Sequence, residues 1–315
     1  MKFGTSIVNR GPLATRDNMV RLAQKAEELN FDSVWISDHI VVPTEIYSKY
    51  PYSVGGEFPA KPTEPYVEPL TLMTYLAACT QRISLGSSVL IIPYRNPVFA
   101  AKIIATLDYL SNGRVIVGAG IGWMEEEFKA LGLNTYQERG AVTDEYIQLF
   151  RELWTKENPS FKGKYYQVSN IGFSPKPVQK PCPPIWIGGH TKPAIRRAAT
   201  LGDGWHPIGL RPPADLSPDD FANRVKYLRD CALEAGRNPD MITISFRVPL
   251  QFTDNPGSPR KPFTGKPEDI VADIVHYRNL GVRHLIVDFM LGSMEAILEG
   301  VERFAREVMP LVPKG

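Results

Sequence analysis

An acid and a histidine stand side by side in the stretch SVWISDHIVVP, directly after a short apolar run. Carboxylate and imidazole groups are the usual carriers of protons in enzymes. Because neighbouring residues of an extended chain point to opposite sides, one of Asp38 and His39 can face a site while the other braces the wall behind it. We expect His39 to transfer a proton or to contact a ring. The alternative is a structural histidine bonded to the backbone.

Three alternate glycines occur in VIVGAGIGWMEEEF, after a run of β-branched residues. The pattern is close to a dinucleotide-binding turn, but that fingerprint needs a glycine where this chain has Trp123. Three glutamates then follow at the start of a helix, where a pyrophosphate would have to bind and would be repelled. We therefore expect a strand that ends in a floor of small residues, in which Gly120, Ile121 and Gly122 make room for a planar ring.

The stretch PPIWIGGHTKPAIRRAATLGDGW is the best candidate for holding a phosphate. Gly188 and Gly189 allow close approach of the backbone at a strand-to-helix junction, and the helix that follows offers free N–H groups to an anion. Arg211, just past the next strand, is expected to add a positive charge. The alternative is a tight turn whose glycines serve geometry alone.

Small residues also end a strand in ISLGSSVLIIPYRNP, where apolar residues follow them. This order suits a flat ring that lies against the strand end, with Ser87 or Ser88 forming a hydrogen bond and Val89 acting as a shelf. The alternative is that the small residues serve only close packing.

Metal chemistry is not expected. The other histidines, His190, His206, His276 and His284, show neither the HxH nor the HExxH spacing of zinc sites. A metal-dependent barrel hydrolase is therefore the last of the alternatives considered.

The composition is that of a soluble globular protein, with 43% hydrophobic and 22% charged residues. No stretch suits a signal peptide or a membrane span, and Cys79, Cys182 and Cys231 have no disulfide or metal spacing, which predicts a cytoplasmic protein with no membrane partner. Residues 156–211 contain nine basic and two acidic residues, although the net charge of the chain is only +2. This segment fits a small polyanionic ligand better than nucleic acid; the alternative is a solvated Lys-rich loop.

Strands and helices alternate along the chain and must position these groups. Short apolar runs predict eight strands, at residues 2–7, 33–37, 83–89, 115–118, 184–188, 204–208, 242–248 and 284–288. Helices are predicted to start at Pro69, Pro97, Pro218 and Pro267, to begin from Thr15, and to cover residues 138–154, 192–201 and 293–308.

Eight alternating units without a break in composition predict an α/β protein, a single (β/α)8 TIM-barrel domain over residues 1–315. Two insertions are expected, an aromatic one at residues 41–68 after the second strand and a Pro-rich one at residues 173–184 before the fifth. In such barrels the active site lies at the carboxyl ends of the strands, where the groups above are placed. The runner-up, a Rossmann-type sheet with a cap, loses its best motif at Trp123.

Together, SVWISDHIVVP, RISLGSSVLIIPYRNPVFAAKIIATLDYLSNGRVIVGAGIGWMEEEFKALG and PPIWIGGHTKPAIRRAATLGDGW resemble the luciferase-like flavin and deazaflavin oxidoreductases, in the branch assigned to coenzyme F420. The resemblance runs from Phe3 to about Trp205. It implies a TIM barrel whose mouth holds an isoalloxazine or deazaflavin ring, a non-proline cis peptide at Ser88-Val89 behind that ring, and a homodimer.

Position by position, the resemblance also assigns residues to the cofactor. It places Asp38 and Gly122 near the ring, His190 and Thr191 in the phosphate turn beside Gly188 and Gly189, and Arg211 where the family has a basic phosphate ligand. His39 matches the acid/base histidine proposed for sugar-phosphate dehydrogenases of the family.

One departure bears on the substrate. Those dehydrogenases have a glutamate proton donor directly after the fourth-strand glycine, and this chain has Trp123 there. The difference argues against a sugar phosphate and for a small hydrophobic substrate beside Trp123. The aromatic insertion, with Tyr66 near its end, is expected to cover that substrate as a lid.

The sequence thus predicts an oxidoreductase that transfers a hydride between coenzyme F420 and a small hydrophobic organic substrate, with His39 as proton donor. The first alternative is an FMN-dependent monooxygenase that uses reduced flavin and O2. The second is a flavin-binding barrel without turnover.

Overall fold

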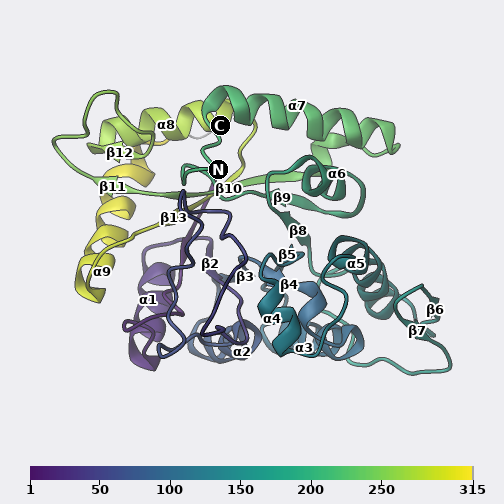
Figure 1. Cartoon of the computed structure of the whole chain (residues 1–315). Helices are drawn as coiled ribbons and strands as arrows, with labels where there is room; N and C mark the ends of the chain where they lie inside the picture. The colour runs from purple at the N-terminus through teal and green to yellow at the C-terminus, as the bar shows by residue number, and fades with distance from the viewer. Residues whose placement is uncertain (314–315) are drawn as a thin grey trace.

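The computed structural model describes residues 1–313 and contains a closed barrel of eight parallel strands (Figure 1). Each barrel strand pairs with the next one along the chain, and the last pairs with the first. The barrel strands are β1 (Lys2–Ser6), β2 (Ser33–Ile36), β3 (Ser84–Ser87), β5 (Val115–Gly120), β8 (Ile185–Gly188), β9 (Gly204–His206), β10 (Thr243–Pro249) and β13 (His284–Asp288). The predicted (β/α)8 fold is confirmed.

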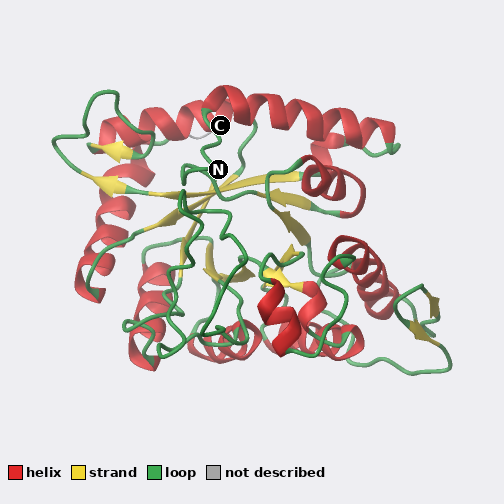
Figure 2. Ribbon diagram, viewed as in Figure 1, coloured by secondary structure: helices red, strands yellow, loops and turns green. Residues whose placement is uncertain are grey.

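Helices lie between the strands and surround the barrel (Figure 2). They are α1 (Arg16–Glu28), α2 (Pro69–Cys79), α3 (Pro97–Leu110), α4 (Glu125–Ala130), α5 (Arg139–Thr155), α6 (Lys192–Leu201), α7 (Pro218–Glu234), α8 (Pro267–Asn279) and α9 (Met294–Arg303). Four of them begin at the prolines predicted to start helices, because proline already has a helical φ and its missing N–H would have no partner there.

Several elements end one or two residues away from the predicted positions, and two of them also change character at their ends. The strand predicted over residues 83–89 ends at Ser87, and a separate short strand, β4 (Leu90–Ile91), pairs with β5. The helix predicted over residues 293–308 is regular only to Arg303 and continues as a π-helical turn, η3 (Phe304–Val308). Short 3-10 turns are η1 (Ile92–Tyr94), η2 (Pro239–Met241) and η4 (Met309–Leu311).

Insertions leave the barrel at three places. The two predicted ones occupy residues 37–68 and 156–184, so the second begins well before the predicted residue 173. That insertion carries a hairpin, β6 (Phe161–Lys162) and β7 (Gln167–Val168), which projects from one side of the molecule (Figure 1). A third was not predicted. It lies between β10 and α8 and contains the parallel pair β11 (Gln251–Phe252) and β12 (Thr264–Gly265).

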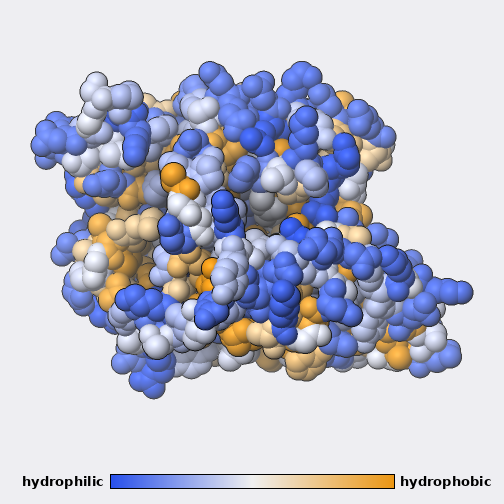
Figure 3. Space-filling model, viewed as in Figure 1, coloured by the Kyte–Doolittle hydropathy of each residue, from blue (hydrophilic) through white to orange (hydrophobic). Residues whose placement is uncertain are grey.

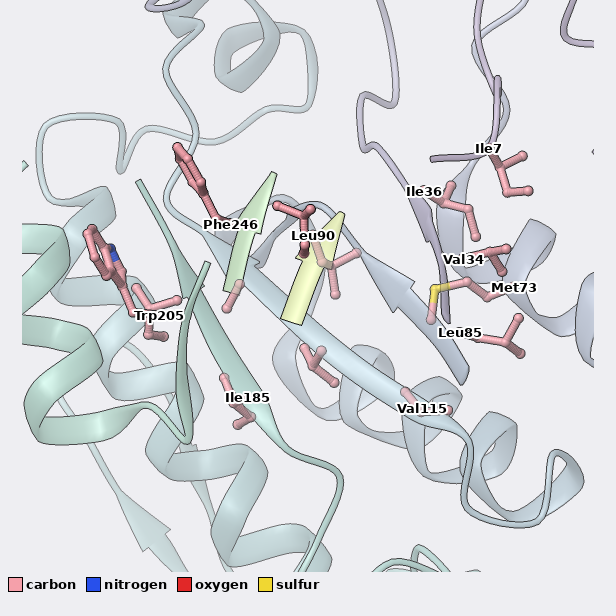
Figure 4. Packing of buried hydrophobic residues seen from close by; sticks show 14 of the residues in the cluster. Ile7, Val34, Ile36, Met73, Leu85, Leu90, Val115, Ile185, Trp205 and Phe246 are labelled. Carbon is pink, nitrogen blue, oxygen red and sulfur yellow. The ribbon is translucent and has the colours of Figure 1, made fainter. Parts of the chain in front are cut away.

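The main hydrophobic core lies between the strands and the helices around them. Figure 4 shows one part of it, where Met73 of α2 lies beside Val34 of β2 and Leu85 of β3. Hydrophilic residues cover most of the face shown in Figure 3. In the described part of the chain, no helix has the length and apolar character needed to cross a membrane.

Inside the barrel, aromatic and histidine rings fill the space between the strands. Trp35 stacks on Trp186 and on His206, with ring centroids 5.3 and 4.6 Å apart, and the edge of Trp35 meets His284. Burial, with Arg247 and His284 nearby, lowers the pKa of His206 to about 3. Burial, with Lys2 nearby, lowers the pKa of His284 to about 3 as well. Both rings are therefore neutral at physiological pH.

Glycines of β5 and β8 make room for the end of β3. A Cβ on Gly118 would lie 1.9 Å from the carbonyl oxygen of Ser87. A Cβ on Gly120 or Gly188 would lie 2.4 or 2.7 Å from a methyl group of Val89. The space at Gly120 is therefore taken by Val89, and not directly by a ring as the sequence had suggested.

Acid should destabilise the fold through the two buried histidines. In the unfolded chain they bind protons below about pH 6.5, whereas in the folded protein they stay neutral until about pH 3. The unfolded state therefore binds more protons in this window, and the free energy of unfolding should fall between pH 7 and pH 5. Urea unfolding at several pH values measures this. His284→Gln should weaken the dependence, and His276→Gln, at an exposed position of α8, should leave it unchanged.

Gly118→Ala should be strongly destabilising, because the new methyl group would meet backbone that cannot rotate away. We expect the free energy of unfolding to fall by about 1–3 kcal/mol, the usual cost of overpacking. Gly172→Ala is the matched control, since a Cβ there meets nothing within 4 Å, and it should change stability by less than about 0.5 kcal/mol. Equal urea midpoints for the two variants would contradict the account of Gly118.

Candidate active site

A cavity of about 490 Å³ opens where the barrel strands end. All fourteen residues predicted for the site line it: Asp38, His39, Tyr66, Ser88, Val89, Gly120, Ile121, Gly122, Trp123, Gly188, Gly189, His190, Thr191 and Arg211. The fold thus brings together groups that are far apart in the sequence. Lining a cavity does not give a residue a role, however, and these side chains differ in what they contact.

His39 is held against a buried carboxylate. Its Nδ1 lies 2.5 Å from Oε2 of Glu127, a residue of α4 with no exposed surface. The rings of Phe58, Tyr66 and Trp123 surround the imidazole, at centroid distances of 4.7, 5.2 and 6.0 Å. His39 is therefore a fixed polar group in an otherwise aromatic part of the wall.

Asp38 is held by contacts within the protein. Its carboxylate accepts hydrogen bonds from the Arg95 guanidinium at 2.7 and 2.9 Å and from the backbone N–H of Ile91 at 2.8 Å. Arg95 also binds Glu68 at 2.7 Å. Asp38 thus braces β4 while its neighbour His39 faces the cavity, as alternation along an extended chain predicts. Both carboxylate oxygens are engaged within the protein although Asp38 lines the cavity, and the expectation that Asp38 approaches a ring stays a prediction.

The peptide between Ser88 and Val89 is cis, as the resemblance implied. The hydroxyl groups near it are already engaged. Ser87 donates to the carbonyl of Gly118 at 2.9 Å, and Ser88 Oγ lies 2.8 Å from Nε2 of the neutral His206. Both hydroxyl groups are thus engaged inside the barrel, and the expected hydrogen bond from Ser87 or Ser88 to a ring stays a prediction.

The bond from Ser88 belongs to a chain with a fixed direction. Arg247 donates to Ser88 Oγ at 2.9 Å, and the neutral His206 ring, which donates from Nδ1, accepts the serine proton at Nε2. His206 Nδ1 then donates to Ser245 Oγ at 2.7 Å, because the Ser245 proton is given to the carbonyl of Trp205 at 3.2 Å. This chain, from Arg247 to Trp205, holds the end of β3 in place.

The turn between β8 and α6 has backbone N–H groups that no side chain caps. Gly189 has a φ of +92°, and its carbonyl accepts a hydrogen bond from Trp205 Nε1 at 2.8 Å. The Thr191 side chain caps no N–H of α6, so first-turn N–H groups are available to an anion. His190 Nδ1 is buried without a partner, and burial together with Arg224 lowers the pKa of His190. The turn is therefore built to receive an acceptor.

Positive charge dominates the cavity wall. Five arginines line it: Arg10, Arg139, Arg197, Arg211 and Arg247. The one lining carboxylate, Asp38, is already paired with Arg95. Arg211 and Arg247 share Asp288, yet Arg211 Nε is buried and unpartnered. The cavity therefore favours an anionic ligand.

The basic segment 156–211 contributes less to this charge than its composition suggested. Only Arg197 and Arg211 of that segment line the cavity. Lys164 pairs with Glu138 at 2.6 Å, and Lys176 donates to the carbonyl of Leu153 at 2.7 Å. The other lining arginines come from elsewhere in the chain, which a local count of charges does not detect.

The aromatic insertion covers the cavity. Tyr50 and Phe58 lie 5.2 and 5.3 Å from Trp123, measured between ring centroids. Tyr66 donates its hydroxyl to Ser37 Oγ at 2.8 Å, and burial raises the pKa of Tyr66 to about 12. These rings form an apolar wall, in which the Tyr66 hydroxyl is already engaged by Ser37.

Glu127 and Arg247 are the main residues that the sequence did not reveal. The three glutamates of MEEEF stand at a helix N-terminus, where acidic residues are normally exposed, so nothing marked the third as buried. Arg247 lies within the apolar strand β10, and a charged residue in a buried strand was the available signal.

No group of three or more His, Cys, Asp and Glu side chains within residues 1–313 is arranged to hold a metal ion. Cys79, Cys182 and Cys231 are free thiols.

Comparison with known proteins finds related sequences and solved structures of similar fold. An F420-dependent glucose-6-phosphate dehydrogenase of Amycolatopsis mediterranei is 35% identical over 192 residues, which are 60% of this chain and 52% of that protein. The monooxygenase RslO1 from Streptomyces bottropensis has a TM-score of 0.79 at 22% identity, over 98% of this chain and 99% of the other. An F420-dependent secondary alcohol dehydrogenase, solved with an F420-acetone adduct, has a TM-score of 0.78 at 18% identity, over 99% of both chains.

The two solved structures share the barrel with this protein. The family match is more specific, because it covers residues 1–283 and so includes every residue that lines the cavity. The chain belongs to the luciferase-like monooxygenase family.

Proposed function

We propose that this protein transfers a hydride between coenzyme F420 and a small hydrophobic organic substrate. The observation that carries the proposal is His39, fixed at 2.5 Å to a buried carboxylate and set in an aromatic wall of the cavity. Oxidation of an alcohol removes a hydride from carbon and a proton from oxygen. A fixed imidazole beside an apolar pocket is suited to take that proton, or to return it in the reverse reaction.

The residues present fit a phosphorylated deazaflavin. The first turn of α6, directly after Gly188 to Thr191, has no side-chain cap on its N–H groups, and Arg139 and Arg197 line the same cavity. Val89 and Ile121 offer apolar surface on which a flat ring can lie. When bound, the deazaflavin supplies or accepts the hydride, and the protein orients the reactants and excludes water.

Charge favours coenzyme F420 over FMN. The coenzyme F420 tail carries carboxylates in addition to its phosphate. Five arginines line the cavity, and two carboxylates, Asp144 and Asp288, pair with three of them, which leaves a positive balance that suits such a ligand. The F420-dependent relative at 35% identity supports the same choice. The second candidate is an FMN-dependent monooxygenase, the activity in the family's description, and the apolar wall of the cavity would suit it too.

The substrate we propose is small and hydrophobic. Trp123, Tyr50 and Phe58 form one apolar face of the cavity beside His39, and the volume of about 490 Å³ must hold both the ring system and the substrate. Binding there would place an alcohol or carbonyl oxygen near the imidazole while its carbon chain contacts the aromatic rings.

Titration of the purified protein with coenzyme F420 and with FMN, at low and high salt, tests the cofactor. We expect tight binding of coenzyme F420 that weakens as salt rises, because arginines supply part of the affinity, and weak binding of FMN. Ligand fluorescence measures both. The opposite preference would favour the monooxygenase, and no binding of either would exclude both candidates.

His39→Ala tests the proton donor. We expect the affinity for the cofactor to stay the same and turnover to fall by about 10²-fold or more, as for loss of a general acid or base. His276→Ala is the matched control, because that histidine is exposed on α8. Unchanged turnover in His39→Ala would remove His39 from the mechanism.

A further inference from the structure

We infer that Glu127 is a positioning residue that fixes which ring nitrogen of His39 carries the proton. The inference rests on the proposed role of His39 and names a residue behind it that does not line the cavity.

Four donors converge on Glu127. Oε2 lies 2.5 Å from His39 Nδ1 and accepts a hydrogen bond from the Tyr94 hydroxyl at 2.9 Å. Oε1 accepts from the backbone N–H groups of Ile40 at 2.7 Å and Val41 at 3.2 Å. Both oxygens are thus engaged, and the side chain has no contact with solvent. A carboxylate surrounded in this way has one fixed orientation.

The chemistry of these partners sets the tautomer. An ionised carboxylate can only accept hydrogen bonds, so Nδ1 of His39 must donate and must carry the ring proton. A neutral imidazole has one such proton, which leaves Nε2 as the nitrogen with a free lone pair. Nε2 has no hydrogen-bond partner within residues 1–313 and is the atom left for a ligand.

This arrangement serves both directions of the proposed reaction. With His39 neutral, Nε2 accepts the proton of a substrate hydroxyl, and the buried carboxylate faces the imidazolium that forms. In the reverse direction, the imidazolium gives the Nε2 proton to a carbonyl oxygen. In either case Glu127 keeps its own four hydrogen bonds and stays a carboxylate.

The carboxylate also joins three separate loops of the barrel mouth. Glu127 belongs to α4, after β5, while Tyr94 belongs to η1, after β4, and His39 follows β2. Phe128, next to Glu127, packs edge-on against Tyr94 at 5.0 Å between ring centroids. The position of the imidazole therefore depends on the position of α4.

The neighbouring glutamates have different partners. Glu126 accepts hydrogen bonds from the backbone N–H groups of Tyr47 and Ser48 in the lid, at 2.9 and 3.0 Å. Glu125 pairs with Lys129 at 2.9 Å and is partly exposed. Glu125→Gln is therefore a matched control, because it makes the same chemical change in the same turn of helix without touching His39.

Glu127→Gln should reverse the tautomer of His39. The N–H groups of Ile40 and Val41 hold the amide oxygen at the Oε1 position, so the amide NH2 group is left at Oε2, facing Nδ1. An NH2 group donates, so Nδ1 must become the acceptor and the proton must move to Nε2. Two-dimensional 1H–15N spectra of protein labelled with 15N-histidine distinguish protonated from unprotonated ring nitrogens, without cofactor or substrate.

We expect the wild type and Glu125→Gln to have His39 protonated at Nδ1 and Glu127→Gln to have it protonated at Nε2. The His39 signals are those missing from His39→Gln, and unchanged His206 and His284 signals show that the barrel interior is intact. Protonation at Nε2 in the neutral wild type would overturn the inference even if Glu127→Gln did not fold. So would an unchanged tautomer in a folded Glu127→Gln. Neither result depends on cofactor binding, so failure of the proposed function would be seen separately, in the titration.

Discussion

The cavity depends on the point where β3 leaves the barrel. After Ser87 the chain leaves β5, with which β3 pairs up to Gly86, and pairs with it again at Leu90, so the segment between has few ladder hydrogen bonds to hold it. Three other constraints hold this segment. The row of hydrogen bonds from Arg247 to Trp205 fixes Ser88, and the Asp38 carboxylate accepts a hydrogen bond from the N–H of Ile91. The glycines of β5 and β8 leave space for the segment beside them. Val89, held in this way, becomes part of the cavity wall.

Each buried carboxylate near the mouth has a definite partner. Asp38 faces Arg95, Glu127 faces His39, and Asp288 lies between Arg211 and Arg247. Burying an unpaired charge costs free energy, so these ion pairs are needed for the protein to fold as well as for the geometry of the site. Since Asp288 has two arginine partners, positive charge is left over on one side of the cavity. The aromatic insertion supplies an uncharged wall on another, which divides the cavity into a charged and an apolar part.

Much of this was visible in the sequence. Apolar runs and N-terminal prolines located eight strands and the starts of four helices, because both signals are local. The residues lining the cavity followed from a rule of topology, that strand ends meet at one face. The contacts of each side chain did not follow, because the partners are remote: Asp38 binds Arg95, Ser88 binds His206, and His39 binds Glu127. The insertion between β10 and α8 was not predicted, because its apolar residues do not recur at the spacing of a strand or a helix.

The chain of hydrogen bonds from Arg247 to Trp205 has a further consequence. It begins at a guanidinium, which can only donate, and ends at a carbonyl, which can only accept. A row of hydroxyl and imidazole groups with such ends cannot reverse its polarity, so it cannot work as a proton wire. This row of side chains therefore holds the end of β3 in place without providing a path for protons through that part of the barrel.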